Sequence, residues 1–400
     1  MADAPDEPED TKDRRTLSEL QGATRLAVDG TRAVTDIVQA MHDAVGVVPT
    51  KLGPGLVYST IRGVTRLVGA GVERALAALA PLLGAGDGAG TRQRELVVAA
   101  VNGVLGDYLA ASRNPLAITA GLRRGGAPLT LTREALAAAI PEASGHVVLL
   151  VHGSAASDLG WRWKGHDHGA ALEQDLGVTA VYARYNSGLH ISDNGALLRG
   201  LIGELLAAWP VAVEGLHIVA HSMGGLVARS ACIDAAWLGA LRTMVFLGTP
   251  HHGASLERGG NWIDTTLGLT PWTRPLARLG KVRSAGVTDL RFGSVRASDW
   301  QARDRFALGR DPRSPLPLPA GVACYAVAAT LLRASGAARD SDGMVSVESA
   351  LGVDSHRPEM NLVFPAGHTL VTTGSHLDLL SSPVVYEQLR GWLAQTARRS

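Results

Sequence analysis

The sequence predicts an α/β fold, in which a mostly parallel central sheet is covered by helices on both faces. From about residue 128 onward, short apolar runs alternate with segments of helical periodicity, which is the pattern that parallel sheets produce. Hydrophobic residues make up 46% of the chain and charged residues 19%. This composition supports a large buried core and excludes a disordered chain.

The charges of the chain nearly cancel, with 38 Lys and Arg against 37 Asp and Glu and a formal net charge of +1. A general nucleic-acid binder carries a basic field, and an acidic solvating chain carries the opposite field. The balance excludes both classes, and we expect no nucleic-acid partner.

The aromatic residues divide the chain unevenly. All 8 Trp lie between Trp161 and Trp392, whereas the first 160 residues hold only Tyr58 and Tyr108 as aromatic residues. A chain of 400 residues has room for about two to three domains. The predicted parts are a disordered acidic tail at 1–15, a helical accessory region at 16–125 and a catalytic α/β domain at 128–400.

The accessory region shows helical periodicity without any chemical motif. Apolar residues recur every three to four positions in the segments 26–45 and 57–79, which predicts two amphipathic helices. The Gly-rich stretch 84–90 follows no strand and does not match GxGxxG, so it is interpreted as a linker. The helices have two interpretations: peripheral contact with a lipid or granule surface, or a bundle packed on the catalytic domain.

No segment indicates secretion or membrane insertion. The two cysteines, Cys232 and Cys324, form no CxxC pair, and the acidic N-terminus lacks the basic and apolar regions of a signal peptide. The longest uncharged run, 314–332, is interrupted by three prolines and is too short to span a bilayer. We expect a soluble, cytoplasmic protein of unknown oligomeric state.

Strands and helices of the catalytic part follow from periodicity and from capping residues. The predicted strands are Pro128–Leu131, His146–Val151, Thr179–Tyr185, Leu216–Ala220, Thr243–Leu247, Val322–Ala328 and Asn361–Phe364. The predicted helices are Arg94–Ala111, Thr132–Ile140, Asp167–Leu176, Ser192–Trp209, Met223–Ala236 and Pro383–Thr396. Thr132 and either Ser192 or Asp193 are the expected N-caps.

The sharpest motif is the stretch LHIVAHSMGGLV at 216–227, where an apolar strand runs through Ser222 into a helix. This strand–turn–helix context is that of a nucleophile elbow, which exposes a serine hydroxyl above a sheet. The tight turn requires small residues two positions away on either side, and Ala220 and Gly224 meet that need. The alternative is a Gly-rich turn with an incidental serine.

Two backbone N–H groups are candidates for binding an oxyanion. The Met223 N–H lies at the start of the helix, where the dipole favours negative charge. The second is the Ser154 N–H, because the stretch VVLLVHGS places it after an early strand and Gly153 permits close approach. His152 is expected to brace this loop.

A serine nucleophile needs a base and an acid, which follow it along the chain in this arrangement. Asp342, in SDGMVSVESA, is the preferred acid, and Asp340 and Asp354 remain alternatives. Asp342 has a purely structural interpretation as well, as a turn residue before Gly343. His376, which follows the last predicted strand, is the preferred base. The other histidines considered are His368 as a rival, His221 as a packing residue, and His356, which precedes that strand.

These motifs together resemble the α/β-hydrolase superfamily, in particular the lipase branch near the GPI-inositol-deacylase-like (PGAP-type) hydrolases. The matching stretches are VVLLVHGSAASDLGW, IVAHSMGGLVARSA, VFLGTPHHGASLERGGNWID, SDGMVSVESA and SHLDLLSSPVVYEQLRGWL, over roughly residues 145–395. The resemblance implies a serine hydrolase of esters with Ser222 as nucleophile, Asp342 as acid and His376 as base. Ala220 departs from the usual glycine, and the resemblance does not establish a GPI substrate.

Other residues are assigned to the surroundings of the site. Trp161, Trp163 and Trp262 are candidates for a substrate pocket, with core packing as the alternative for the first two. The segment 249–253 is expected at the rim. Its paired histidines do not indicate a metal, because no carboxylate accompanies them at ligand spacing. The triplet 166–168 is interpreted as a helix start, where Asp167 favours the dipole, and not as a metal site. We expect no metal or organic cofactor.

The predicted function is serine-dependent hydrolysis of carboxylic esters, of the carboxylesterase or lipase type (EC 3.1.1), on small-molecule or lipid esters. An acyltransferase that uses the same triad is one alternative, because the acyl-enzyme is common to both reactions. A lipid- or polymer-surface-binding protein with little catalysis is the other.

Overall fold

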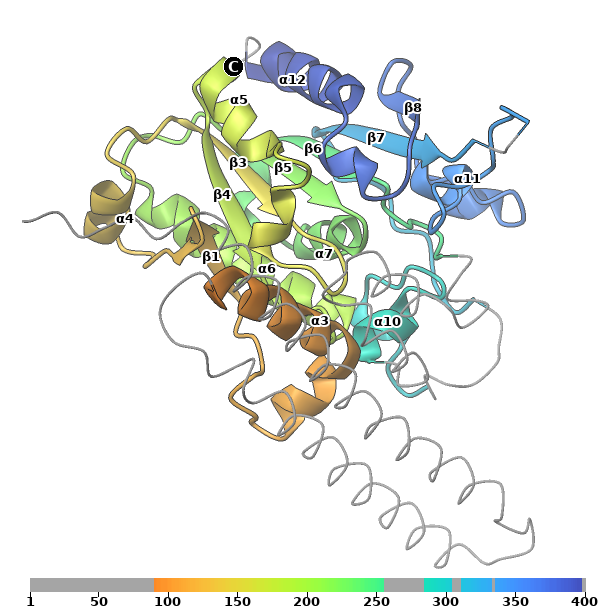
Figure 1. Cartoon of the computed structure of the whole chain (residues 1–400), viewed down its shortest axis with the longest axis horizontal. Coiled ribbons are helices and arrows are strands. Elements are labelled where there is room, and N and C mark those ends of the chain that lie inside the picture. The colour runs from red at the N-terminus through yellow and green to blue at the C-terminus, as the bar shows by residue number, and fades with distance from the viewer. Residues whose placement is uncertain (1–89, 255–283, 304–310, 333–334, 398–400) are drawn as a thin grey trace, which may run out of the picture.

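The computed structural model describes residues 90–254, 284–303, 311–332 and 335–397 (Figure 1). The predicted tail at 1–15, the predicted helices at 26–45 and 57–79, and nearly all of the Gly-rich stretch 84–90 lie outside these residues, as does Trp262. The surface-contact interpretation of the first helices therefore stays a prediction.

The described residues form one eight-stranded sheet in the order β2-β1-β4-β3-β5-β6-β7-β8. The first two strands are antiparallel to their neighbours, and the remaining strands are parallel. The predicted mostly parallel α/β fold is confirmed. The strands are β1 Gly121–Arg124, β2 Ala127–Pro128, β3 His146–Val151, β4 Thr179–Arg184, β5 Gly215–His221, β6 Leu241–Leu247, β7 Ala323–Thr330 and β8 Thr369–Thr373.

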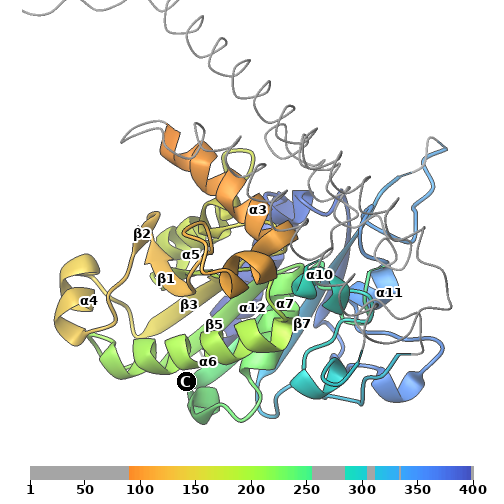
Figure 2. The same cartoon turned by 90° about the horizontal axis from the view of Figure 1, so that it is seen from below.

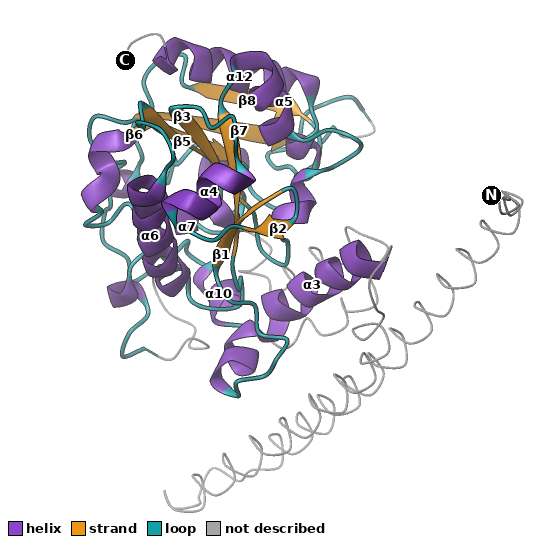
Figure 3. Ribbon diagram, turned by 90° about the vertical axis from the view of Figure 1, so that its left-hand side faces the viewer, coloured by secondary structure: helices purple, strands orange, loops and turns teal. Residues whose placement is uncertain are grey.

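Helices cover both faces of the sheet (Figure 3). Along β3, Val147, Leu149 and Val151 belong to a core shared with α3, α6 and α7, whereas Val148 and Leu150 belong to a core shared with α5 and α12. A continuous apolar run therefore serves both faces, because successive side chains of a strand alternate. The helices are α3 Gly90–Ala111, α4 Arg133–Ala139, α5 His168–Leu176, α6 Ile191–Ala208, α7 Met223–Ala231, α10 Ala285–Asp289, α11 Val347–Ala350 and α12 Pro383–Ala397.

The two ends of the sheet differ from the sequence prediction. The predicted strand at 361–364 is wrong: the last strand is β8, which pairs with β7. The apolar run there is a loop: Val363 is 83% exposed, whereas Leu362 and Phe364 on either side of it pack against the protein. At the other end, the predicted strand 128–131 overlaps β2 only at Pro128, and β1 is not among the predicted strands. Arg123 and Arg124 mask the apolar pattern of β1, and they are accommodated there because they pair with Asp158 and Glu173.

The helix starts confirm two of the expected caps and correct a third. Thr132 accepts a hydrogen bond from the Ala135 N–H at 3.3 Å, and Asp167 accepts from the Gly169 N–H at 2.9 Å. Helix α6 starts at Ile191, before Ser192 or Asp193 could cap it. Its first N–H group donates instead to the distant Asp289 carboxylate at 2.8 Å, a tertiary contact that local sequence does not reveal.

Helix α3, which the sequence places within the accessory region, packs into the core of the sheet. Its residues Val101, Val104 and Leu109 belong to the same buried cluster as β3 and α7, and its Glu95 pairs with Arg184 at the end of β4. Among the described residues, no helix is both long and apolar enough to cross a bilayer.

Candidate active site

The predicted elbow is present between β5 and α7. Ser222 has φ 56° and ψ −130°, a conformation that costs about 1–3 kcal/mol for a residue other than glycine. Its own N–H donates to the carbonyl of Leu247, the last residue of the neighbouring strand β6, at 2.8 Å. The strained turn is therefore held from the side by the sheet.

Glycines allow the elbow to approach the loop after β3. A Cβ added at Gly224 would lie 2.4 Å from the carbonyl oxygens of both Val151 and His152, and a Cβ at Gly153 would lie 2.9 Å from the Cβ of Ser222. Real Cβ atoms do not approach other heavy atoms this closely. The requirement for a small residue at 224 is thus confirmed, and the loop that carries Ser154 lies directly against the serine.

Asp342 lies after β7 and is only 2% exposed. One carboxylate oxygen accepts the N–H groups of Met344 and Val345 at 2.9 and 2.8 Å. The other accepts Nδ1 of His376 at 2.7 Å. Burial by itself would raise the pKa of Asp342, but the facing His376 and the two backbone donors outweigh it and lower that pKa.

His376 follows β8 and is 3% exposed. Its backbone N–H donates to the carbonyl of Asp342 at 3.1 Å, so two contacts join the two residues. Its ring lies over the end of β6, because a Cβ added at Gly248 would be 3.1 Å from His376 Cε1 and Nδ1. Since Leu247 also binds the Ser222 N–H, the structure gathers Ser222, Asp342 and His376 around the carboxyl ends of β5, β6 and β7.

His221, expected as a packing residue, also makes a contact that the sequence did not indicate. Its Nε2 donates to the carbonyl of His376 at 3.1 Å, and the two rings lie 4.7 Å apart. Burial, and then the neighbouring His376, lower the pKa of His221 to about 3. His221 is therefore neutral near pH 7 and holds the backbone of the histidine beside it.

The alternative acids and bases lie elsewhere. Asp340 is exposed, and Asp354 accepts the N–H groups of His356 and Arg357 in a loop turn. His368 precedes β8, and its Nδ1 bonds to the carbonyl of Cys324 near the start of β7. That position is at the end of the sheet opposite to Ser222, because β7 and β8 are parallel to β5 and β6.

The tryptophans after the β3 loop differ in their surroundings. Trp161 is 1% exposed, and its ring meets those of His168 and His221 edge-on at 6.5 Å, which favours core packing over a pocket wall. Trp163 forms a tight turn with His166 through two backbone hydrogen bonds of 2.9 Å. Its substrate-pocket role remains a prediction.

The triplet at 166–168 does more than cap α5. His166 Nε2 lies 2.8 Å from His168 Nδ1, and His168 Nε2 donates to the carbonyl of Leu379 at 2.9 Å. In the same turn, Lys164 pairs with Asp378 at 2.6 Å. These contacts attach the segment after the β3 loop to the segment after His376.

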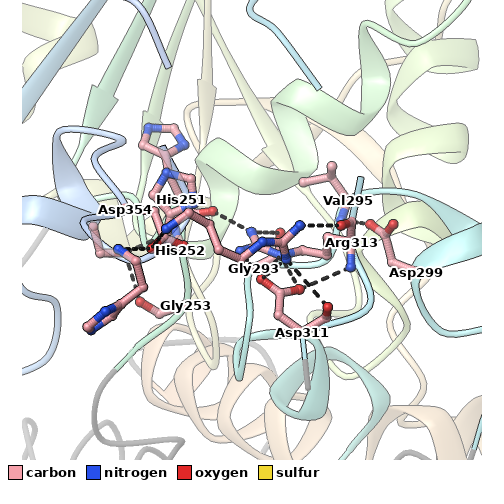
Figure 4. Close-up of polar contacts among 12 residues, drawn as sticks. His251, His252, Gly253, Gly293, Val295, Asp299, Asp311, Arg313 and Asp354 are labelled. Carbon is pink, nitrogen blue, oxygen red and sulfur yellow. Dashed lines mark hydrogen bonds and ion pairs between the residues drawn. The ribbon is translucent and has the colours of Figure 1, made fainter. Parts of the chain in front are cut away.

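The segment 249–253 is held by a buried polar network (Figure 4). Arg313, which pairs with Asp311, donates to the carbonyl of His251 at 2.8 Å, and the Ser349 hydroxyl donates to the carbonyl of Gly253 at 2.8 Å. The network joins the loop after β6 to α11. Within the described part of the chain, no group of three or more His, Cys, Asp or Glu residues is placed to hold a metal ion.

A family model matches part of this chain. Residues 183–311 match the family model described as a PGAP1-like alpha/beta domain. The search of curated proteins found no match.

Three solved structures similar to this chain are lipases or phospholipases. They are Bacillus licheniformis lipase BlEst2 in mature form (18% identity, 62% of this chain and 91% of that chain, TM-score 0.42), Aspergillus fumigatus lipase B (13%, 66% and 58%, TM-score 0.38) and phospholipase PlaB from Legionella pneumophila (16%, 52% and 46%, TM-score 0.36). The strand order and the strand–turn–helix elbow after β5 are those of an α/β-hydrolase fold, and residues 183–311 of the chain are similar to a PGAP1-like alpha/beta domain.

Proposed function

We propose that this protein is a carboxylic ester hydrolase that works through an acyl-enzyme on Ser222. One observation carries the proposal: a buried Asp342–His376 pair with a 2.7 Å hydrogen bond lies at the same edge of the sheet as a serine held in a strained elbow. A hydroxyl is a weak nucleophile at its ordinary pKa, and such a pair supplies the base that it needs.

The hydrogen bond to Asp342 assigns the protons of His376. Because Nδ1 donates to the carboxylate, Nε2 is the unprotonated nitrogen of the neutral ring and can accept the Ser222 proton. The lowered pKa of Asp342 keeps that carboxylate ionised, so it stabilises the imidazolium that forms. His376 is held in one orientation because its backbone is bound by both Asp342 and His221.

The reaction then proceeds in two halves. Ser222 Oγ bonds to the ester carbonyl carbon as its proton moves to His376, and the carbonyl oxygen becomes an oxyanion. His376 gives the proton to the alcohol oxygen of the ester as the bond between that oxygen and the acyl carbon breaks. The alcohol departs, and the acyl group stays on Ser222. Water, deprotonated by the same histidine, attacks the acyl carbon, and the proton returns to Ser222 as the acid departs.

The oxyanion is assigned to the N–H groups of Met223 and Ser154. Met223 is the first residue of α7, so its N–H points out of the positive end of a helix. The loop containing Ser154 lies against Ser222 through Gly153. Loss of one such donor costs about 3–4 kcal/mol in the transition state.

Turnover of p-nitrophenyl acetate and butyrate tests this proposal. Ser222→Ala is expected to lower kcat at least about 10³-fold with an unchanged melting temperature, whereas Ser112→Ala, at an exposed helix end, leaves kcat unchanged. Undiminished turnover by Ser222→Ala would refute the acyl-enzyme on this residue.

A further inference from the structure

Helix α3 lies outside the stretch that matches the family model, yet it reaches the loops of the active site. It packs against the short helix α10 and against the 3-10 turn that follows the β3 loop (Figure 2). Both segments flank the chain at the carboxyl ends of the central strands. The helix is therefore close to the oxyanion side of the elbow.

Helix α3 meets the oxyanion loop, the segment after β3 that carries Ser154, where Gly103 in the middle of the helix faces Ala155. A Cβ added at Gly103 would lie 2.6 Å from the Cβ of Ala155, 2.7 Å from its Cα and 3.0 Å from its nitrogen. Two of these atoms are backbone, so no side-chain rotation could relieve the contact. A methyl group at 103 must displace either the helix or the oxyanion loop.

Ala155 is a sensitive point of that loop. Its φ of 54° lies in the left-handed region, which is unfavourable for a residue with a Cβ. Its N–H donates to the hydroxyl of Ser187 at 3.0 Å, which holds the peptide plane between Ser154 and Ala155. Because the Ser154 N–H is on the preceding peptide, a displacement of Ala155 changes the direction of the proposed oxyanion donor.

The loop after β4, which supplies Ser187, is interlocked with the same helix. A Cβ at Gly188 would lie 2.2 Å from the carbonyl of Asn102, and Asn186 donates through its side chain to the carbonyl of Gly106 at 2.9 Å. Helix α3 thus contacts the oxyanion loop directly at one point and supports its hydrogen-bond partner at another.

The third contact comes from the start of α10. The Ser284 hydroxyl donates to the carbonyl of Gly103 at 2.7 Å, and the Ala285 N–H donates to Asp107 at 3.1 Å. These bonds limit movement of α3 away from the sheet. An added methyl group at 103 therefore acts on the oxyanion loop and not on the helix alone.

We infer that α3 is a positioning element of the catalytic centre and that Gly103 is a positioning residue, which sets the oxyanion loop at Ser154 through steric contact with Ala155. This inference rests on the proposed function. It assigns part of the predicted accessory region to the active site.

The test compares Gly103→Ala with Gly200→Ala. Both glycines lie inside helices, so both substitutions gain the same helix propensity. Only Gly103→Ala adds a steric contact, because nothing lies within 4 Å of a Cβ added at 200. On p-nitrophenyl butyrate, Gly103→Ala is expected to lower kcat about 10–100-fold with KM little changed, since a misaligned donor affects the transition state more than the bound ester. Gly200→Ala keeps the wild-type kcat.

A boronic acid separates positioning from general destabilisation, because its tetrahedral adduct on the serine places an oxygen where the oxyanion forms. Its inhibition constant is expected to rise in Gly103→Ala by about the same factor as kcat falls. The double variant Gly103→Ala/Ala155→Gly is expected to recover part of both losses, because it removes the Cβ at 2.6 Å. A structural role alone would lower the melting temperature without this parallel.

Ser187→Ala supplies a second measurement if Gly103→Ala fails to fold, because it adds no volume and removes the acceptor of the Ala155 N–H. It is expected to lower kcat about fivefold. Wild-type kcat in Ser187→Ala, or equal kcat in folded Gly103→Ala and Gly200→Ala, overturns the inference while Ser222-dependent turnover still supports the proposed function. Turnover that survives Ser222→Ala overturns both.

Discussion

The two sides of the proposed catalytic centre are held by different forces. On the oxyanion side, close packing of small residues places the loop: Gly153 against Ser222, Gly224 against the end of β3, and Gly103 against Ala155. On the base side, polar contacts place the side chains, with Asp342 bound by His376 and by two backbone N–H groups. One side therefore depends on shape and the other on charge.

This difference determines which substitutions each side tolerates. A methyl group is the damaging change where backbones touch, because close-packed interiors cannot absorb even one extra carbon without strain. Where a buried carboxylate is matched by donors, an isosteric loss of charge is the damaging change, because it alters protonation and leaves volume unchanged. The predictions below test this division.

The largest effect is expected from Asp342→Asn on the base side. The amide keeps the volume but cannot hold His376 in the tautomer with Nδ1 protonated, so kcat is expected to fall about 10³–10⁴-fold. Steady-state hydrolysis of p-nitrophenyl butyrate measures it. Asp340→Asn, at the exposed carboxylate two residues earlier, is the control and should keep full activity; a comparable loss there would reassign the acid.

An intermediate effect is expected from Gly248→Ala, which tests shape on the side assigned to charge. Gly248 has φ 59°, and an added Cβ would lie 2.8 Å from Leu379 Cδ1 and 3.1 Å from Cε1 and Nδ1 of the His376 ring. We expect kcat to fall about tenfold or more. Gly177→Ala is the matched control, because Gly177 has φ 65° but nothing lies within 4 Å of an added Cβ. We expect this variant to lose stability and to keep the wild-type kcat. Equal kcat in the two variants would restrict the role of shape to the oxyanion side.

A smaller effect is expected at His221, which contacts both sides. A Cβ added at Gly153 would lie 3.3 Å from its ring, and its Nε2 donates to the carbonyl of His376. His221→Phe keeps a ring but removes the donor, and kcat is expected to fall about fivefold, the effect of one hydrogen bond of ~1 kcal/mol. His221→Gln, whose amide can donate, should recover most of it. Full activity in His221→Phe would remove this residue from the positioning of the base.

The same residue predicts a dependence of stability on pH. The pKa of His221 is about 3 in the folded chain and near 6.5 when unfolded, so the unfolded state takes up a proton first as the pH falls. This contribution is complete above pH ~6.5 and is lost between there and pH ~3. Chemical denaturation at pH 7 and pH 4 should show a steeper loss for wild type than for His221→Gln, by roughly 1 kcal/mol per pH unit; parallel losses would contradict it.

Much of the base side could be predicted from the sequence, because its polar residues are few and their chain order is constrained. Chain order narrows the candidates, and the choice of Asp342 and His376 over their rivals also depends on their positions after predicted strands and on the resemblance. The structure places Ser222, Asp342 and His376 at one edge of the sheet. Their roles remain the proposal that the experiments test. The contact of His221 with the backbone of His376 could not be predicted, because the sequence shows only that His221 precedes Ser222.

The shape-held side could be predicted only in part. The requirement for a small residue at 224 follows from the turn itself, but the contact of Gly103 with Ala155 joins residues more than 50 positions apart, and no local pattern encodes it. The same limit explains β1, whose arginines are neutralised by tertiary partners, and the N-terminus of α6, which a distant carboxylate binds. Local propensity does not contain such contacts.

The most direct test of the central claim is the site of covalent modification by a fluorophosphonate. After incubation of the full chain, digestion and mass spectrometry, we expect a single adduct on Ser222, formed much more slowly in Asp342→Asn and absent in Ser222→Ala. An adduct on another serine, or a modified Ser222→Ala variant with retained ester turnover, would contradict the assignment of this centre.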